Sequence, residues 1–247
     1  MINQIFNEDC FESLKRIDDN SIDMILTDPP YGTTSCYWDH KIDVQSMMNE
    51  FLRVIKDNGA IVIFSQLPFA ADLINSARKF FRYEWIWEKT LAAGFLNAKK
   101  MPMRCHENIL VFYKKLPLYN PQFWFSKKIP KKQTGLQASR VYAKFERKEL
   151  YSSPDGKRYP RDVIFADSIT TTLDEDGKFA KHLHPTQKPV ELLEYFIKTY
   201  SNENELILDP FIGSGSTAIA CKNLNRNFIG FELDKNYFDI AIQRLKD

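Results

Sequence analysis

The chain has 247 residues, of which 44% are hydrophobic, so it suits one α/β domain with an insertion or two small domains. No apolar run approaches the ~18 residues of a membrane span, and the first residues lack the basic start and apolar stretch of a signal peptide. The net charge of +2 excludes little, but the four scattered cysteines (Cys10, Cys36, Cys105, Cys221) argue against a disulfide framework or metal site and predict a cytoplasmic protein.

Apolar periodicity predicts strands that alternate with helices on either side of an irregular stretch. In chain order, the first part predicts strand 2–6, helix 11–17, strand 21–27, helix 44–56, strand 60–64, helix 68–80 and strands 83–87 and 109–113. The last part predicts helix 189–197, strand 206–208, helix 216–224, strand 227–231 and helix 237–245. This alternation indicates a doubly wound, mainly parallel α/β sheet with both faces covered.

Positive charge is concentrated in one stretch of the chain. Residues 97–161 contain sixteen Lys and Arg but four Asp and Glu, a net charge of +12, whereas the remaining residues carry −10. The stretch from 117 to about 183 is also rich in Pro, aromatic and Thr residues, with weak periodicity. We therefore expect a separate, partly irregular module there, with a polyanionic partner for its basic part.

The sequence Asp28-Pro29-Pro30-Tyr31 directly follows a buried strand. Because two consecutive prolines cannot continue a ladder, the strand must end in a rigid turn. The turn presents a carboxylate, the Pro29 carbonyl and an aromatic ring, which together suit a flat ring with an exocyclic amine. Taken alone, the motif is equally consistent with a plain turn that buries its tyrosine.

A second turn, Asp209-Pro210-Phe211-Ile212-Gly213-Ser214-Gly215-Ser216-Thr217, connects a predicted strand to a predicted helix. Its glycines let a ligand approach the backbone, and the helix start offers free N–H groups. The following strand ends in Glu232, whose carboxylate can accept hydrogen bonds from ribose hydroxyls. This series predicts a nucleotide site; the alternative is a turn packed for structural reasons, with Glu232 solvated.

Gly213-x-Gly215-x-x-Ala218 also fits a dinucleotide fingerprint, which makes a nicotinamide-dependent oxidoreductase an alternative. However, only about 30 residues follow the turn, too few for the rest of a conventional dinucleotide domain. That alternative also gives the Asp28 turn no role. In a circularly permuted order, the last helix would lead into strand 2–6, and both turns would meet at the carboxyl edge of the sheet.

The two turns together strongly resemble the S-adenosylmethionine-dependent DNA amino-methyltransferases of the beta group, in which the reactive motif precedes the target-recognition region and the cofactor motif. Residues 184–189, His-Pro-Thr-Gln-Lys-Pro, resemble that group's segment beside the cofactor. The resemblance implies a seven-stranded, Rossmann-like sheet in permuted order. It implies a catalytic half at 1–114, a DNA-binding target-recognition insertion at 115–183 and a cofactor-binding half at 184–247.

The resemblance also assigns roles to residues. It makes Asp28, Pro29, Pro30 and Tyr31 catalytic, with Asp28 also at the cofactor. The implied cofactor-binding residues are Asp9, Cys10, Lys188, Asp209, Phe211, Gly213, Ser214, Gly215, Ser216, Thr217 and Glu232. Asp9 is equally suited to cap helix 11–17. Because members of the group commonly dimerise, a homodimer is expected as well.

The implied reaction is methyl transfer to adenine N6 in DNA, for which Asp-Pro-Pro-Tyr is the usual motif; Ser-Pro-Pro-Tyr is usual for cytosine N4, which is the alternative. The target base must leave the duplex to reach the turn, where Tyr31 offers a stacking surface. Cytosine-C5 chemistry is disfavoured because none of the four cysteines follows a proline. For base edges, the insertion offers Thr134, Gln137, Ser139 and Arg140.

Overall fold

The computed structural model describes residues 1–32, 42–125, 156–168 and 187–246. It divides into two compact units, the first made of residues 1–120 and 162–247 and the second of residues 121–161. Within the described residues, no helix is long and apolar enough to cross a membrane. The candidate base-reading residues between 134 and 140, and residues 184–186 of the segment 184–189, lie outside the described residues.

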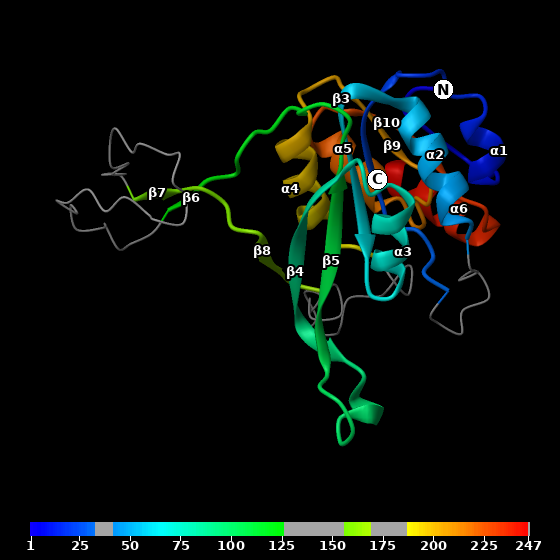
Figure 1. Ribbon diagram of the computed structural model, residues 1–247. Coiled ribbons are helices and arrows are strands. Elements are labelled where there is room, and N and C mark those ends of the chain that lie inside the picture. Colours follow the sequence, from blue (N-terminus) through cyan, green and yellow to red (C-terminus); the bar gives the residue numbers. More distant parts are fainter. Residues whose placement is uncertain (33–41, 126–155, 169–186, 247) are drawn as a thin grey trace. The chain divides into compact units, whose positions relative to one another are not determined.

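The first unit contains an eight-stranded sheet with the order β1-β10-β9-β2-β3-β5-β4-β8 (Figure 1). Its strands are β1 (Gln4–Phe6), β2 (Ile22–Thr27), β3 (Ile55–Ser65), β4 (Phe81–Ala93), β5 (Arg104–Phe112), β8 (Val163–Ala166), β9 (Leu206–Asp209) and β10 (Asn227–Phe231). The five strands from β1 to β3 are parallel, and β5 is antiparallel to both of its neighbours. The predicted mainly parallel sheet is confirmed.

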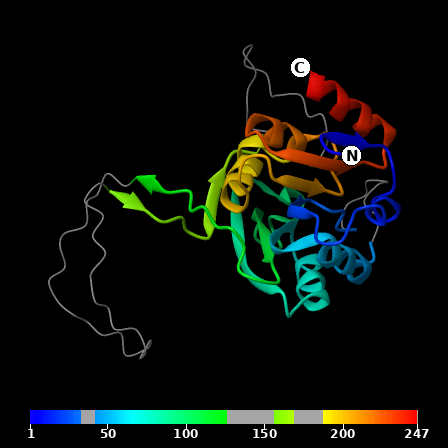
Figure 2. The same cartoon turned by 90° about the horizontal axis from the view of Figure 1, so that it is seen from above.

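Within the described parts of the chain, six helices cover the two faces of this sheet. They are α1 (Cys10–Leu14), α2 (Val44–Val54), α3 (Phe69–Ser76), α4 (Val190–Tyr200), α5 (Ser216–Asn223) and α6 (Lys235–Lys246). The first three pack on one face and the last three on the other (Figure 2). The fold is therefore doubly wound, with a separate apolar core on each side of the sheet.

Strand β3 shows how the sequence builds both cores. Val62 and Phe64 belong to the core under α4, whereas Ile61 and Ile63 belong to the core under α2. Successive side chains of a strand point to opposite faces, so a continuous apolar run fills both sides of a covered sheet. Strands of this kind place their carboxyl ends, and the turns that follow, at one edge of the sheet.

Several element boundaries differ from those predicted, and those of α2 and α3 are examples. Helix α2 ends at Val54, and residues 57–59 are part of β3 rather than a turn that ends the helix. The reason is the pairing of Ile55 with Ile22 of β2, which draws the chain into the sheet early. Helix α3 ends at Ser76 instead of about residue 80.

The sheet also gains a strand from the predicted insertion. Residues 163–166 pair in parallel with β4, and Trp87 donates a 2.9 Å hydrogen bond to the carbonyl of Ala166. The described sheet therefore has eight strands instead of the expected seven, and residues 162–168 belong with the first unit. The second unit, within its described residues, contains the short hairpin β6 (Trp124–Phe125) and β7 (Lys157–Arg158).

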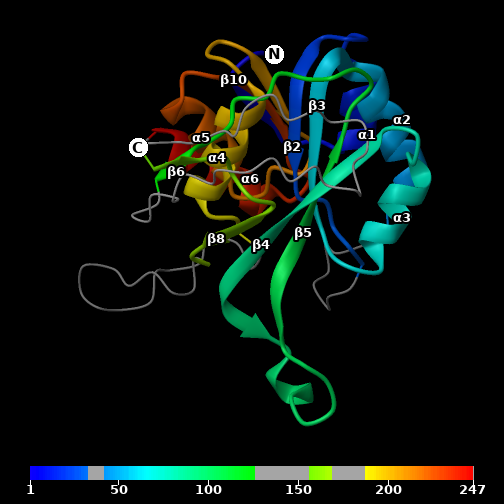
Figure 3. The same cartoon turned by 60° about the vertical axis from the view of Figure 1, so that its left-hand side comes forward.

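Strands β4 and β5 are much longer than predicted. They continue past the sheet as a hairpin that ends in a 3-10 turn, η1 (Phe95–Asn97), and this hairpin projects away from the layers (Figure 3). The exposed part lacks the alternating apolar pattern of a packed strand, which is why periodicity did not predict it.

Candidate active site

A cavity of about 980 Å³ opens at the carboxyl edge of the parallel strands. Its wall is formed by the segments that follow β2, β9 and β10, by the start of α5 and by residues near α1. The wall contains these predicted residues: Asp9, Cys10, Asp28, Pro29, Pro30, Tyr31, Lys188, Asp209, Phe211, Gly213, Ser214, Ser216, Thr217 and Glu232. The structure therefore brings the two predicted turns into one cavity, although they are far apart in sequence.

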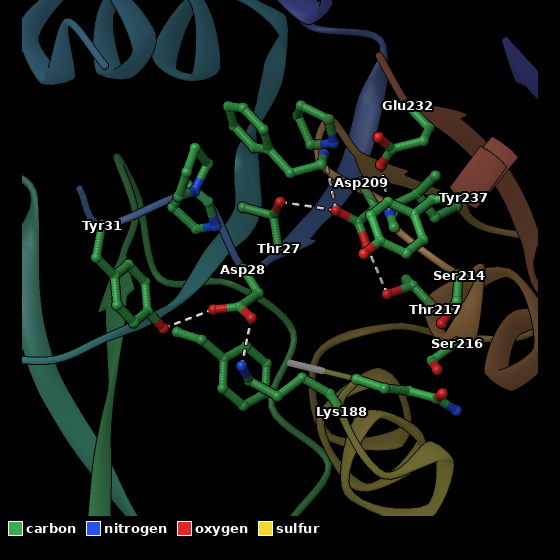
Figure 4. Close-up of a pocket in the computed structure, with 18 of the residues that line it drawn as sticks. Thr27, Asp28, Tyr31, Lys188, Asp209, Ser214, Ser216, Thr217, Glu232 and Tyr237 are labelled. Atoms are coloured by element: carbon green, nitrogen blue, oxygen red, sulfur yellow. Dashed lines mark hydrogen bonds and ion pairs between the residues drawn. The ribbon is translucent and has the colours of Figure 1, made fainter. Parts of the chain in front are cut away.

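Asp209 joins the two turns. Its Oδ1 accepts a 2.7 Å hydrogen bond from Thr27, the residue before Asp28, and its Oδ2 accepts a 2.6 Å hydrogen bond from Thr217 of α5 (Figure 4). The backbone N–H of Phe211 donates to the same carboxylate at 3.2 Å. Because these bonds use both oxygens, Asp209 fixes the spacing between β2, β9 and α5.

The environment of Asp209 opposes its ionisation. The side chain is buried, and burial raises its pKa to about 6, with a further contribution from the negative charge of Asp28. The hydrogen bonds from Thr217, Thr27 and Phe211 lower the pKa but do not offset the burial.

Asp28 sits at the centre of a second network. Tyr31 donates a 2.5 Å hydrogen bond to Oδ1, and Lys188 Nζ pairs with Oδ2 (Figure 4). Burial raises the pKa of Asp28, and so does the nearby negative charge of Glu107, against the lowering effect of Lys188. Burial alone would lower the pKa of Lys188, but Asp28 and Glu107 together raise it, so the ammonium stays charged.

Sequence reasoning missed two members of this network, Glu107 of β5 and Lys89 of β4. Glu107 is 8% exposed, forms an ion pair with Lys89 and lies 3.5 Å from Lys188 Nζ. Although burial opposes its ionisation, the two lysines outweigh it and keep the pKa of Glu107 below its ordinary value. The one available signal was that Glu107 is an isolated acid in a long basic stretch.

Two glutamines that were not predicted also line the cavity. Gln66 Oε1 and Gln187 Oε1 are buried and accept no hydrogen bond from the described residues. Buried polar atoms normally have partners, so such acceptors indicate places for the N–H groups of a ligand. Gln66 follows the end of β3 and belongs to no motif, whereas Gln187 precedes α4 and belongs to the segment 184–189 that resembles the cofactor-flanking segment of the family.

Glu232 lies at the other end of the cavity from the Asp28 network, against the Gly-rich turn. Its carboxylate accepts hydrogen bonds from the N–H groups of Gly213 at 2.9 Å and Asp234 at 2.8 Å. Burial raises its pKa in spite of these bonds. Asp9 caps α1 by accepting hydrogen bonds from the N–H groups of Phe11 and Glu12, and it also lines the cavity. Its position therefore suits both of the roles considered for it, the helix cap and the cofactor contact.

The two glycines of the turn do different things. Gly213 lines the cavity with φ +53°, a conformation that favours glycine. Gly215, φ +84°, precedes α5 but is not among the residues that line the cavity; a Cβ there would lie 2.9 Å from Ala241 Cβ of α6. Its role in the structure is close helix packing. Arg244 of α6 also holds the turn, with a 2.6 Å hydrogen bond to the Ser214 carbonyl.

Comparison with known proteins identifies the architecture. Residues 22–243 match the model of a family described as DNA methylase, N6_N4_Mtase. The chain belongs to this family of DNA methyltransferases. The assignment decides against the nicotinamide alternative, and it makes S-adenosylmethionine the methyl donor of this methyltransferase.

Individual relatives agree with the assignment. The chain is 32% identical to the Type II methyltransferase M.BglII of Bacillus subtilis, over 99% of this chain and 69% of that protein. A crystal structure of an M1.HpyAVI–SAM complex is 28% identical, with a TM-score of 0.63 and 98% coverage of both chains. The cytosine-N4-specific PvuII DNA methyltransferase shares the fold, with a TM-score of 0.70 at 16% identity, over 99% of this chain and 86% of that one.

The cavity of the methyltransferase suits its donor. S-adenosylmethionine is a nucleoside joined to a charged amino acid, so it needs acceptors for ribose hydroxyls and an ammonium group, donors for a carboxylate, and apolar surface for its base. The wall offers buried carboxylates, the hydroxyls of Ser214, Ser216 and Thr217, and the rings of Phe211 and Phe231. The residues present therefore fit the donor in both size and chemistry.

Proposed function

We propose that the methyltransferase acts on the exocyclic N6 of adenine, extruded from DNA at a specific sequence. The observation that carries this proposal is the position of the Asp28 carboxylate, at the carboxyl end of β2 and in the same cavity as the Gly-rich turn. The Asp-Pro-Pro-Tyr motif, usual for adenine N6 in the resembling group, supports adenine over cytosine.

The catalytic role assigned to Asp28 is to accept a hydrogen bond from the N6 amine. The Pro29 carbonyl accepts the second amine hydrogen, and Pro30 keeps the turn rigid. With both hydrogens held, the nitrogen lone pair is freed from the ring and directed toward the methyl donor. Positioning and electrostatics then do most of the catalysis, and no covalent intermediate is needed.

Tyr31 is suited to hold the adenine ring, because its own ring is already fixed. It stacks on Phe69, with ring centroids 5.2 Å apart, and its hydroxyl is bonded to Asp28. A preorganised aromatic side chain costs little further conformational entropy when it stacks on a base.

For the donor, we assign the residues of the Gly-rich turn and both ends of the cavity. In this assignment, the Glu232 carboxylate accepts hydrogen bonds from the ribose hydroxyls, and Asp9 and Cys10 flank the adenine of the donor. The methionine portion is held by Phe211, Gly213, Ser214, Ser216 and Thr217, with Lys188 nearby. Asp209 supports this turn by its hydrogen bonds with Phe211 and Thr217, and Gly215 supports it by allowing α6 to pack closely. The bound donor supplies an electrophilic methyl group on a sulfonium.

We also propose that the basic insertion at 115–183 binds DNA and reads the target sequence. Its charge supports this role, since lysines and arginines supply phosphate contacts that set register on the duplex. The expected homodimer and the cytoplasmic location stay predictions.

The decisive experiment is to incubate the protein with S-adenosylmethionine and DNA, digest the DNA and identify the methylated nucleoside by mass spectrometry. N6-methyladenine is expected. Asp28→Ala should abolish its formation, whereas S-adenosylhomocysteine should still raise the melting temperature of the variant, because the Gly-rich turn is intact.

Asp57→Ala is the matched control, since Asp57 forms ion pairs with Lys114 and Lys115 away from the cavity. It should methylate as the unchanged protein does. If the product is N4-methylcytosine, the adenine assignment is wrong and the alternative, transfer to cytosine N4, replaces it. The cytosine-N4-specific PvuII enzyme has the same fold. Near-normal turnover by Asp28→Ala would remove Asp28 from the mechanism.

A further inference from the structure

The hairpin of β4 and β5 forms an arm, residues 89–106, and apart from Lys89 none of its residues has a role in the site described so far. Its strands pair as far as Ala93 and Arg104 and project from the sheet (Figure 3). Every residue from 90 to 106 is exposed. A two-stranded hairpin without a covering layer is marginally stable in water. An arm of this kind is therefore expected to serve contact with a partner.

The tip of the arm is apolar. Phe95 is 77% exposed and Leu96 is 96% exposed, and Met101 on the returning side is 58% exposed. Large apolar side chains grouped on a projecting element mark an interaction site. Gly94, with φ +94°, makes the turn that presents them.

The charge of the arm identifies the partner as a polyanion. No acidic residue occurs between Glu88 and Glu107, whereas the arm carries Lys89, Lys99, Lys100 and Arg104. Two copies of this tip would repel each other, so the same charge argues against a tip-to-tip contact between subunits. Duplex DNA combines phosphates, which attract the lysines, with stacked bases, which accept apolar side chains.

The root of the arm lies in the wall of the active-site cavity. Lys89, Leu91, Ala92 and Ala93 line the cavity that contains Asp28. Lys89 is fixed there by its ion pair with Glu107. At about 3.3 Å per residue, the four steps from Lys89 to Ala93 span about 13 Å, more than the depth of a DNA groove, which is about 8 Å.

We propose that the arm is a wedge that enters the duplex beside the target base. Phe95 and Leu96 occupy the space that the extruded base leaves, and Lys99, Lys100 and Arg104 contact the flanking phosphates. The wedge lowers the free energy of the extruded state, because apolar side chains replace the stacking that the base loses. This inference rests on the proposed transfer to an extruded base.

The test is the double variant Phe95→Ser/Leu96→Ser, assayed on a duplex that contains the methylated sequence found for the unchanged protein. Methyl transfer to the paired duplex should fall by about tenfold or more, since unstacking a base costs a few kcal/mol. Replacing the base opposite the target by a mismatch should restore most of the rate, because a mismatched base is easier to extrude. Stabilisation by S-adenosylhomocysteine should be unchanged.

Ile2→Ser is the matched control. Ile2 is 56% exposed and precedes β1, so it lies toward the amino end of the parallel strands, and it does not line the cavity. It should leave both rates unchanged. If the double variant methylates paired duplex at the normal rate, the wedge is wrong while the proposed function stands.

Two further outcomes would also overturn the wedge. One is a loss of activity that the mismatch does not restore. The other is a dimer, detected by light scattering, that becomes monomeric in the double variant, which would make the tip a contact between subunits. A failure of the proposed function would look different, since the unchanged protein would then produce no methylated base.

Discussion

At the residue scale, the buried carboxylates of the active site are stabilised by contacts that differ in kind. Asp28 and Glu107 both pair with Lys188, whose positive charge lowers the pKa of each, but burial still leaves the pKa of Asp28 above its ordinary value. Among the residues that the structure describes, the partners of the Asp209 carboxylate are two hydroxyls and one N–H group, and none of them is a cation. These hydrogen bonds do not offset the cost of burying the charged form of Asp209.

This difference predicts a pH-dependent effect of Asp209→Asn. The pKa of Asp209 is raised from 3.8 to about 6 in the folded chain, so its contribution to stability is fully present below pH 3.8 and is lost as the pH rises through 6. The shift corresponds to roughly 3 kcal/mol at most. The neutral variant lacks this loss, so its melting temperature relative to the unchanged protein should increase between pH 5 and pH 8.

The comparison is made without the methyl donor, and all other titrating groups are common to both proteins. A difference in melting temperature that stays constant over this pH range would show that Asp209 does not titrate there. A lower affinity of the variant for S-adenosylhomocysteine would show, in addition, that the Thr27 and Thr217 contacts set the geometry of the turn.

At the element scale, the contact between α5 and α6 positions the Gly-rich turn. Gly215 permits this contact, because the two helices approach to where a single methyl group would collide with Ala241. The fingerprint glycine therefore acts through helix packing, and only the structure separates this role from that of Gly213.

Gly215→Ala should destabilise the protein by about 1–3 kcal/mol and weaken donor binding, because the new Cβ displaces α6 and with it the Arg244 bond to the turn. Chemical denaturation and titration with S-adenosylhomocysteine measure the two effects. The matched control is Gly94→Ala, at a similar positive φ but with nothing within 4 Å of the added Cβ. If both variants are destabilised equally, backbone strain alone accounts for the loss of stability, and the packing role of Gly215 is refuted.

At the scale of the whole molecule, charge is divided between a basic stretch and an acidic remainder. If the basic stretch binds DNA, then removing its lysines should change how affinity depends on salt, since each lost phosphate contact lowers the slope of log K against log salt by about 0.9. The four lysines of 127–132, which lie outside the described residues, are the ones to replace by alanine.

Fluorescence anisotropy at several salt concentrations measures the slope. A control variant loses the same total charge from positions outside the basic stretch 97–161. In it, Lys15, Lys56, Lys79 and Lys222 are replaced by alanine. Its slope should stay near that of the unchanged protein. If the two variants behave alike, only overall charge matters, and the DNA surface lies elsewhere in the chain.

The sequence by itself determined the sheet class, the strand β10 to the residue and both reactive turns, because these depend on local signals: apolar runs, prolines that end a strand and glycines before a helix. It did not predict the long arm, whose exposed residues lack a packed-strand pattern and are ordered by the pairing of β4 with β5. It also did not predict strand β8, a short apolar run in a stretch interpreted as irregular, which is ordered by pairing with the distant strand β4.

Only the tertiary structure decided how the two turns meet. Asp209 spans β2, β9 and α5, and Glu107 reaches Lys188 from an antiparallel strand, over separations in sequence that no periodicity encodes. Local chemistry specifies where a strand must end, but which ends become neighbours is set by strand order, and strand order is fixed by the packing of the whole sheet.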